Sequence, residues 1–133
     1  MATGFEAKSK IGIFDINFDT GERTWSYELR DLFGIPHEVS PDFQLLLQRV
    51  HPEDRRVFNA IALEPLRADC PARKIGQFRI VRPDGSVHWL KLMRMTIFRD
   101  GARHDAVRIL GFVAEIPEPI EHRPPWRNAD IAA

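Results

Sequence analysis

The side chains best suited to chemistry lie together in the run His51-Pro52-Glu53-Asp54. An imidazole and two carboxylates can bind a divalent metal ion or transfer protons. The same run also has the features of a helix start, because proline is favoured in the first turn and acids stabilise its positive end. We therefore interpret His51 as a capping residue and Glu53 and Asp54 as dipole-stabilising acids, and we expect no metal site.

Catalytic motifs are missing from the rest of the sequence. There is no Gly-x-Ser-x-Gly, no glycine-rich phosphate-binding loop and no His-x-x-x-His pair. The acids that do occur fit caps and turns. We expect no catalytic residue and no enzyme activity in this chain; a small enzyme would need polar side chains that converge in a cleft.

Composition limits the classes of partner. The 133 residues fit one domain, and the 19 basic and 19 acidic side chains cancel, so we expect no nucleic-acid binding. No apolar run approaches the ~20 residues that span a bilayer, and the first residues lack a secretory signal. The one cysteine, Cys70, excludes an intramolecular disulfide and a multi-cysteine metal cluster. These features predict a cytoplasmic protein without a membrane segment.

Several short elements must position any site. Alternating apolar residues predict strands over 10–18 and 22–25, around the turn Asp19-Thr20-Gly21. Three helices follow. Ser26, Ser40 and the run at His51 begin them, and Gly34 ends the first. Two strands flank the turn Arg82–Gly85, and a last strand covers 106–116. Helices inserted into an antiparallel sheet predict an α+β fold with the helices on one face.

The strand over 87–98 has apolar residues on both faces. We assign Trp89, Met93, Met95 and Ile97 to the face that meets the helices. Leu90, Leu92 and Phe98 then lie on the opposite, outer face. A strand with two apolar faces is usually covered on both sides, so a second molecule could cover the outer one.

Seven pieces of the sequence, in order, resemble the PAS domain, and more narrowly the PAS-fold subfamily with a C-terminal PAC motif. They are Ile11–Phe18, Thr24-Trp-Ser26, Leu32-Phe-Gly34, His51–Arg55, Phe78-Arg-Ile80, Pro83-Asp-Gly85 and His88-Trp89. The resemblance covers roughly Ile11 to Ile116. It implies a five-stranded antiparallel sheet with a layer of short helices on one face and a small interior pocket. It also implies a sensory role, as in bacterial sensor histidine kinases and related signalling proteins.

This resemblance divides the chain into a polar lead over 1–9, a PAS domain over 10–116 and a proline-rich, flexible tail over 117–133. Family members often close with Asp-Ile-Thr and continue into a helix that couples to an effector. Here Glu115-Ile116-Pro117 stands at that place, and proline prevents an immediate helix. We therefore expect either an excised domain or one that acts through partner signalling proteins.

The resemblance also allows cofactors to be tested. Photoactive flavin binding needs a cysteine in an Asn-Cys-Arg-Phe-Leu-Gln-like stretch, whereas Cys70 precedes a proline in a loop. Val113 stands near a position where flavin-binding members have glutamine. Covalent haem needs Cys-x-x-Cys-His, which is absent. No histidine lies between Pro52 and Pro65 to bind non-covalent haem, so His51 is the one fallback. We expect no coloured cofactor.

Three kinds of function remain open for this sequence, of which the small enzyme with a polar cleft is the third. The first is a sensor that holds a small apolar molecule in a pocket lined by Phe43, Leu47, Phe58, Ile61, Phe78, Met93, Met95 and Val113. The second is a ligand-free dimerisation or protein-interaction adaptor with a filled core. It would form a homodimer through an outer face that consists of Leu90, Leu92, Phe98, Leu110 and Phe112. We place sensing first and expect the homodimer in either case.

Overall fold

In the residues that the computed structural model describes, which are 10–63, 72–101 and 105–122, five strands form one antiparallel sheet. Its order is β2-β1-β5-β4-β3, so β5 lies at the centre and β2 and β3 at the edges. The strands are β1 (Ile11–Asn17), β2 (Arg23–Trp25), β3 (Arg73–Val81), β4 (Val87–Phe98) and β5 (Ala106–Ile116). The predicted five-stranded sheet is confirmed.

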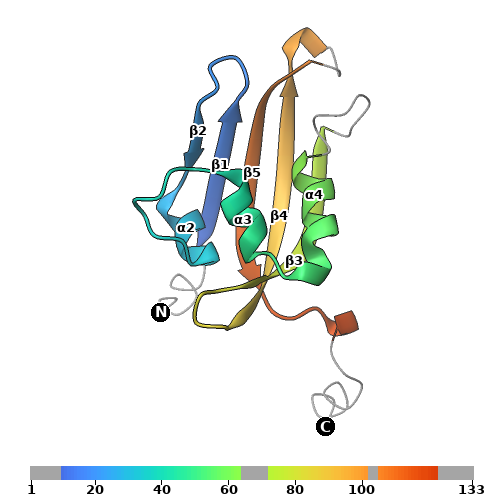
Figure 1. The fold of residues 1–133 in the computed structure, drawn as a ribbon. Coiled ribbons are helices and arrows are strands. Elements are labelled where there is room, and N and C mark those ends of the chain that lie inside the picture. The colour runs from blue at the N-terminus through green and yellow to red at the C-terminus, as the bar shows by residue number, and fades with distance from the viewer. Residues whose placement is uncertain (1–9, 64–71, 102–104, 123–133) are drawn as a thin grey trace, which may run out of the picture.

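Helices cover one face of this sheet and leave the other without an α-helix of the described residues (Figure 1). They are α2 (Tyr27–Phe33), α3 (Phe43–Arg49) and α4 (Arg55–Leu63), with the 3-10 turn η1 (Pro52–Asp54) before α4. Two further 3-10 turns are η3 (Arg99–Gly101), between β4 and β5, and η4 (Ile120–His122), after β5. The α+β class is therefore confirmed. None of the helices in the described ranges is long and apolar enough to cross a membrane.

The predicted caps explain where the helices begin and end. The Ser26 hydroxyl accepts hydrogen bonds from the backbone N–H of Leu29 and of Ile13, so it starts α2 and ties it to β1. Gly34 ends α2 with a φ of 70°, a conformation that glycine adopts without strain. The prediction for α3 was wrong by two residues. Asp42, not Ser40, is its N-cap, because the Asp42 carboxylate accepts the backbone N–H of Gln44.

The faces predicted for β4 are reversed in the structure. Leu90 and Leu92 are fully buried on the helix side, where Leu90 lies opposite Phe78 of β3 and Leu92 lies opposite Val113 of β5. Met93 and Met95 lie on the outer face, opposite Phe112 and Leu110. The prediction for Leu110 and Phe112 agrees with this arrangement, since both lie on the outer face.

A buried arginine explains why the prediction for β4 failed. Arg94 is fully buried and Thr96 is nearly so, and both share the helix side of the strand with Leu92. Hydrophobic patterning assumes that polar side chains point to water, so it assigns the side of β4 that carries these two residues to the outer face, which is wrong. Phe98 is half-buried beside a register shift between Ile97 and Phe98, which ends the regular alternation of β4.

Candidate functional site

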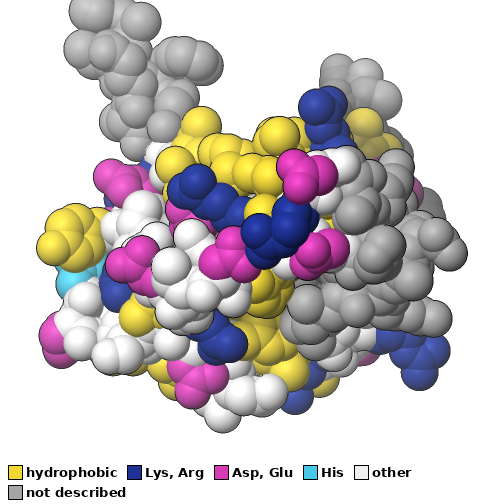
Figure 2. Space-filling view, turned by 90° about the horizontal axis from the view of Figure 1, so that it is seen from above, with side chains coloured by type: hydrophobic (Ala, Val, Ile, Leu, Met, Phe, Trp, Pro, Cys, Tyr) yellow, Lys and Arg dark blue, Asp and Glu magenta, His cyan; other side chains and the backbone are white. Residues whose placement is uncertain are grey.

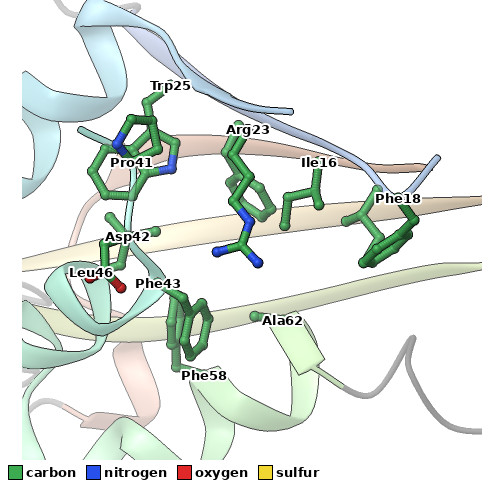
Figure 3. Close-up of a pocket in the computed structure, with 12 residues that line it drawn as sticks. Ile16, Phe18, Arg23, Trp25, Pro41, Asp42, Phe43, Leu46, Phe58 and Ala62 are labelled. Carbon is green, nitrogen blue, oxygen red and sulfur yellow. The ribbon is translucent and has the colours of Figure 1, made fainter. Parts of the chain in front are cut away.

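A cavity of about 110 Å³ lies between the β1, β2 and β5 part of the sheet and helices α3 and α4 (Figure 3). Its walls are mostly apolar. The lining residues are Phe14, Ile16, Phe18, Arg23, Trp25, Pro41, Asp42, Phe43, Leu46, Phe58, Ala62 and Ile109. An apolar cavity of roughly 150 Å³ can hold benzene, so this one, which is open at one side, suits a ring or a short alkyl chain.

Two of the predicted pocket residues line this cavity. Phe43 of α3 and Phe58 of α4 form its helical wall, with stacked rings whose centroids are 5.5 Å apart. Among the others, Ile61, Phe78 and Val113 are buried and Leu47 is partly buried in the hydrophobic core, away from the cavity lining. Met93 and Met95 lie on the opposite face of the sheet, so their predicted position in the pocket is wrong.

Sequence reasoning missed the cationic member of the lining, Arg23. In the sheet register Arg23 pairs with Ile16, which places it on the face that meets the helices. Figure 3 shows its guanidinium reaching from β2 toward Phe43 and Ala62. It makes no hydrogen bond or ion pair with any described residue. The signal was present in the sequence, because the three-residue turn before Glu22 fixes the pairing of β2 with β1.

One carboxylate also lines the cavity. Asp42 stands at the start of α3, where its Oδ1 accepts the Gln44 N–H over 2.9 Å. This bond and the positive end of the helix already engage its charge. Arg23 is therefore the lining charge that lacks a partner among the described residues.

The outer face of the sheet carries a row of apolar side chains. Ile75, Met93, Phe112 and Ile13 lie directly opposite one another across β3, β4, β5 and β1. Ile13 and Ile75 are 39% and 53% exposed. We call these four residues the outer row. Figure 2, which looks down on the molecule of Figure 1, shows hydrophobic side chains along the side away from the helices, beyond a line of charged side chains.

The predicted dimer face coincides with this surface in part. Leu110 and Phe112 lie on it. Leu90 and Leu92 do not, because they are core residues on the helix side. Met93 takes their place on the outer face, next to Phe112. Dimerisation itself stays a prediction.

The run at His51 has a structural role, because it caps the 3-10 turn η1. His51 Nδ1 accepts the backbone N–H of Glu53, as a capping residue does. Within the described ranges, no three side chains of His, Cys, Asp or Glu are grouped as a metal site would require. Cys70, on which the flavin argument depended, lies outside the described residues.

Asp54 joins the helical layer to the edge strand β3. Its carboxylate accepts the Arg79 backbone N–H at 2.7 Å, the Arg79 Nε at 2.9 Å and the Arg79 Nη2 at 2.7 Å. Glu53 adds a longer and more exposed contact to the same guanidinium. Burial raises the pKa of Asp54, but the hydrogen bonds and charge of Arg79 outweigh it, so the pKa lies below the usual 3.8. The same pairing raises the pKa of Arg79.

We expect Asp54→Asn to lower the free energy of unfolding at pH 7 by about 2–3 kcal/mol, since it weakens charge-assisted bonds to a mostly buried arginine. The depressed pKa fixes the pH dependence. The contribution of Asp54 is complete above its unfolded pKa of 3.8 and is lost as the pH falls through the lower folded value. Urea unfolding measured between neutral and strongly acidic pH should therefore show the gap between parent and variant closing in acid.

Glu53→Gln is the matched control, because Glu53 contacts the same arginine with a side chain that is 74% exposed. Its loss should cost less than about 1 kcal/mol, as surface ion pairs do. Equal effects of the two substitutions would contradict the role assigned to Asp54.

The segment after β5 folds back over one end of the outer face. The centroids of the His122 and Trp89 rings are 4.6 Å apart, and the Arg79 guanidinium carbon lies 5.4 Å from the centroid of the same Trp89 ring. Within the tail that the sequence predicts to be flexible, Ile120–His122 form η4. The remainder of the tail, including Trp126, and the predicted lead over 1–9 lie outside the described residues.

Known proteins match this architecture. The family described as the PAS fold matches residues 22–113. The chain is similar to the probable diguanylate cyclase DgcE of Escherichia coli (strain K12), with 26% identity over 108 residues, which are 81% of this chain and 9% of that protein. The chain therefore spans a small part of the length of this curated relative.

Two solved structures share the fold. A sensory box histidine kinase/response regulator from Burkholderia thailandensis has a TM-score of 0.63 and 16% identity, over 99% of this chain and 92% of that one. The N-terminal domain of a diguanylate cyclase with PAS/PAC sensor from Marinobacter aquaeolei has a TM-score of 0.66 and 20% identity, over 86% of this chain and 100% of that one. With the family match spanning more than half of its residues, and with this sheet and helical layer, the chain belongs to the PAS fold family.

Proposed function

We propose that this chain is a sensory module that holds a small, mainly apolar molecule between its sheet and helices α3 and α4. The observation that carries the proposal is the cavity. The core around it is closely packed, with Phe58 and Leu46 almost fully buried, yet the space beside them is unfilled. Unfilled apolar space costs stability, and a ligand that fills it recovers the lost contacts. A filled-core adaptor would have no reason to keep this space.

The module then passes its state to an output domain or a partner signalling protein and performs no catalysis itself. Support comes from the relatives, whose names are those of a histidine kinase and of diguanylate cyclases. A chain of contacts offers a physical route. The cavity wall of α4 follows η1, whose Asp54 binds Arg79; Arg79 lies over Trp89, and Trp89 contacts His122 in the segment after β5.

Ala62→Met tests the cavity. Ala62 lines it from α4 and is 7% exposed, so a methionine side chain at this position extends into the empty space. We expect the free energy of unfolding to rise by about 0.5–2 kcal/mol, as cavity filling commonly does. Toluene, an apolar probe, should shift the backbone amide NMR signals of Phe43 and Phe58 in the parent protein and leave them unmoved in the variant.

Val57→Met is the control, because Val57 is 45% exposed and places the same new side chain on the solvent face of α4. It should bind toluene as the parent does. If toluene shifts no amide around the cavity in the parent, or shifts them equally in the Ala62→Met variant, the sensory pocket is contradicted.

A second function is favoured by the outer row. We propose that two copies of the chain associate through Ile13, Ile75, Met93 and Phe112, whose exposed apolar surface a monomer would leave in water. The segment Pro117–His122 contacts Trp89 at one end of this face. Sedimentation velocity over a range of protein concentrations should show a dimer that dissociates on dilution.

A further inference from the structure

We propose that the molecule held in the cavity is a small monocarboxylic acid whose apolar body fills the cavity and whose carboxylate pairs with Arg23. This inference rests on the proposed sensory pocket and adds to it the chemical class of the ligand. The juxtaposition that carries it is an exposed guanidinium, without a partner among the described residues, on a wall that is otherwise mostly apolar.

The pairing of β2 with β1 places Arg23 on the helix side of the sheet, although a charged side chain is normally found on the solvent side. A strand residue on the helix side normally packs against the core, as its partner Ile16 and its neighbour on the same face, Trp25, do. Arg23 instead brings a permanent charge to the mouth of the cavity, and Figure 3 shows its side chain extended toward Phe43 and Ala62. A nearby arginine gives a contrast. Arg30 is buried, and its guanidinium donates to the carbonyl oxygens of Trp25 and Val39.

The chemistry of a guanidinium selects its partner. It has five N–H donors and no acceptor, and its planar fork matches a carboxylate better than a single neutral oxygen. Beside apolar walls such a pair gains strength, because less water competes for the donors. The Asp42 carboxylate does not fulfil this role in the structure, since it accepts the Gln44 N–H at the start of α3.

The size of the cavity limits the rest of the ligand. With about 110 Å³ it accepts one aromatic ring or a short alkyl chain, and a second charged group would have to enter the apolar part. Phenylacetate is a suitable probe, because its ring suits the space and its carboxylate lies one methylene away. Phenylacetamide has nearly the same shape without the charge, and phenethylamine carries the opposite charge.

Isothermal titration calorimetry of the full chain with these three probes tests the inference. We expect phenylacetate to bind at least tenfold more tightly than phenylacetamide, and phenethylamine more weakly than both. In Arg23→Gln the preference for the acid over the amide should fall to about one, whereas Arg23→Lys should keep part of it. Arg56→Gln removes an exposed cation of α4 outside the cavity lining and should retain the full preference.

The outcomes separate the two proposals. If toluene binds in the cavity but the acid and the amide bind equally, or Arg23→Gln keeps the preference for the acid, the sensory pocket stands and the carboxylic acid is overturned. Tighter binding of phenethylamine would also overturn it, because Asp42 would then be the charge that selects the ligand. If neither toluene nor phenylacetate binds, both proposals fail.

Discussion

Leu92→Glu should leave the domain unfolded or close to it at neutral pH. Leu92 is fully buried in the middle of the helix side of the sheet, between Gly76 of β3 and Val113 of β5. Neither of these opposite residues carries a charge, and Arg94, two residues along on the same face, is itself fully buried, so a carboxylate there must be dehydrated or protonated even beside that arginine. We expect a loss of about 4 kcal/mol or more, a large share of the roughly 5–15 kcal/mol that stabilises a typical domain. Circular dichroism and urea unfolding measure this loss.

Lys91→Glu is the matched control, since it introduces the same side chain one residue earlier on the other face. Lys91 is exposed, so the change should alter the free energy of unfolding by less than about 1 kcal/mol. The pair of substitutions tests which face of β4 meets the helices, because a shift of one residue exchanges every side chain between the two faces. A folded Leu92→Glu protein together with a strongly destabilised Lys91→Glu protein would contradict the described orientation of β4.

Local sequence signals were enough to predict most of the elements. Ser26 and Gly34 mark α2 because a hydroxyl and a left-handed glycine satisfy particular backbone groups at particular helix ends. The strand over 106–116 could be predicted in full, because it is an apolar run rich in β-branched residues that follows the turn at Asp100-Gly101. These signals act over a few residues, so they do not depend on the rest of the fold.

The orientation of β4 could not be predicted in the same way. Both of its faces are apolar, and the polar residues Lys91 and Arg94 lie on opposite faces. Patterning therefore had to choose which of two charges points to water, and it chose wrongly because Arg94 is buried. The deciding information is in other strands. Phe78 and Ile80 of β3, together with Val113 of β5, face the helices. Because paired residues of neighbouring strands share a face, the register places Leu90 and Leu92 of β4 on the helix side.

The cavity was predicted on its helical wall alone. Phe43 and Phe58 follow from the apolar faces of α3 and α4, whereas Arg23 belongs to a strand of three residues, which is too short for a periodic pattern. Its position depends on a pairing with Ile16 that arises from the turn at Gly21, where φ is 77°. A charged residue on an inner face also contradicts the assumption on which patterning depends. Such contradictions are expected where a site binds something.

Phe112→Glu should convert the proposed dimer into a folded monomer. Phe112 is one of the two inner members of the outer row, because it lies opposite Met93 on one side and Ile13 on the other. In an interface through this row a carboxylate would be buried against apolar side chains, whereas in the monomer it is hydrated. We expect the dissociation constant to rise at least about 100-fold, which corresponds to about 2.7 kcal/mol, with little change in unfolding. Sedimentation velocity of parent and variant measures the difference.

Tyr27→Glu is the control for this substitution, because Tyr27 is an aromatic residue that is 65% exposed on α2, on the helix side of the sheet. Both substitutions replace an aromatic side chain by a carboxylate. Tyr27, however, lies away from the proposed interface. A parent that sediments as a monomer, or a Phe112→Glu protein that associates like the parent, contradicts the homodimer. Dissociation by Phe112→Glu and not by Tyr27→Glu would locate the contact on the outer row. Association driven by burial of apolar surface is weakened only where the carboxylate enters the buried surface.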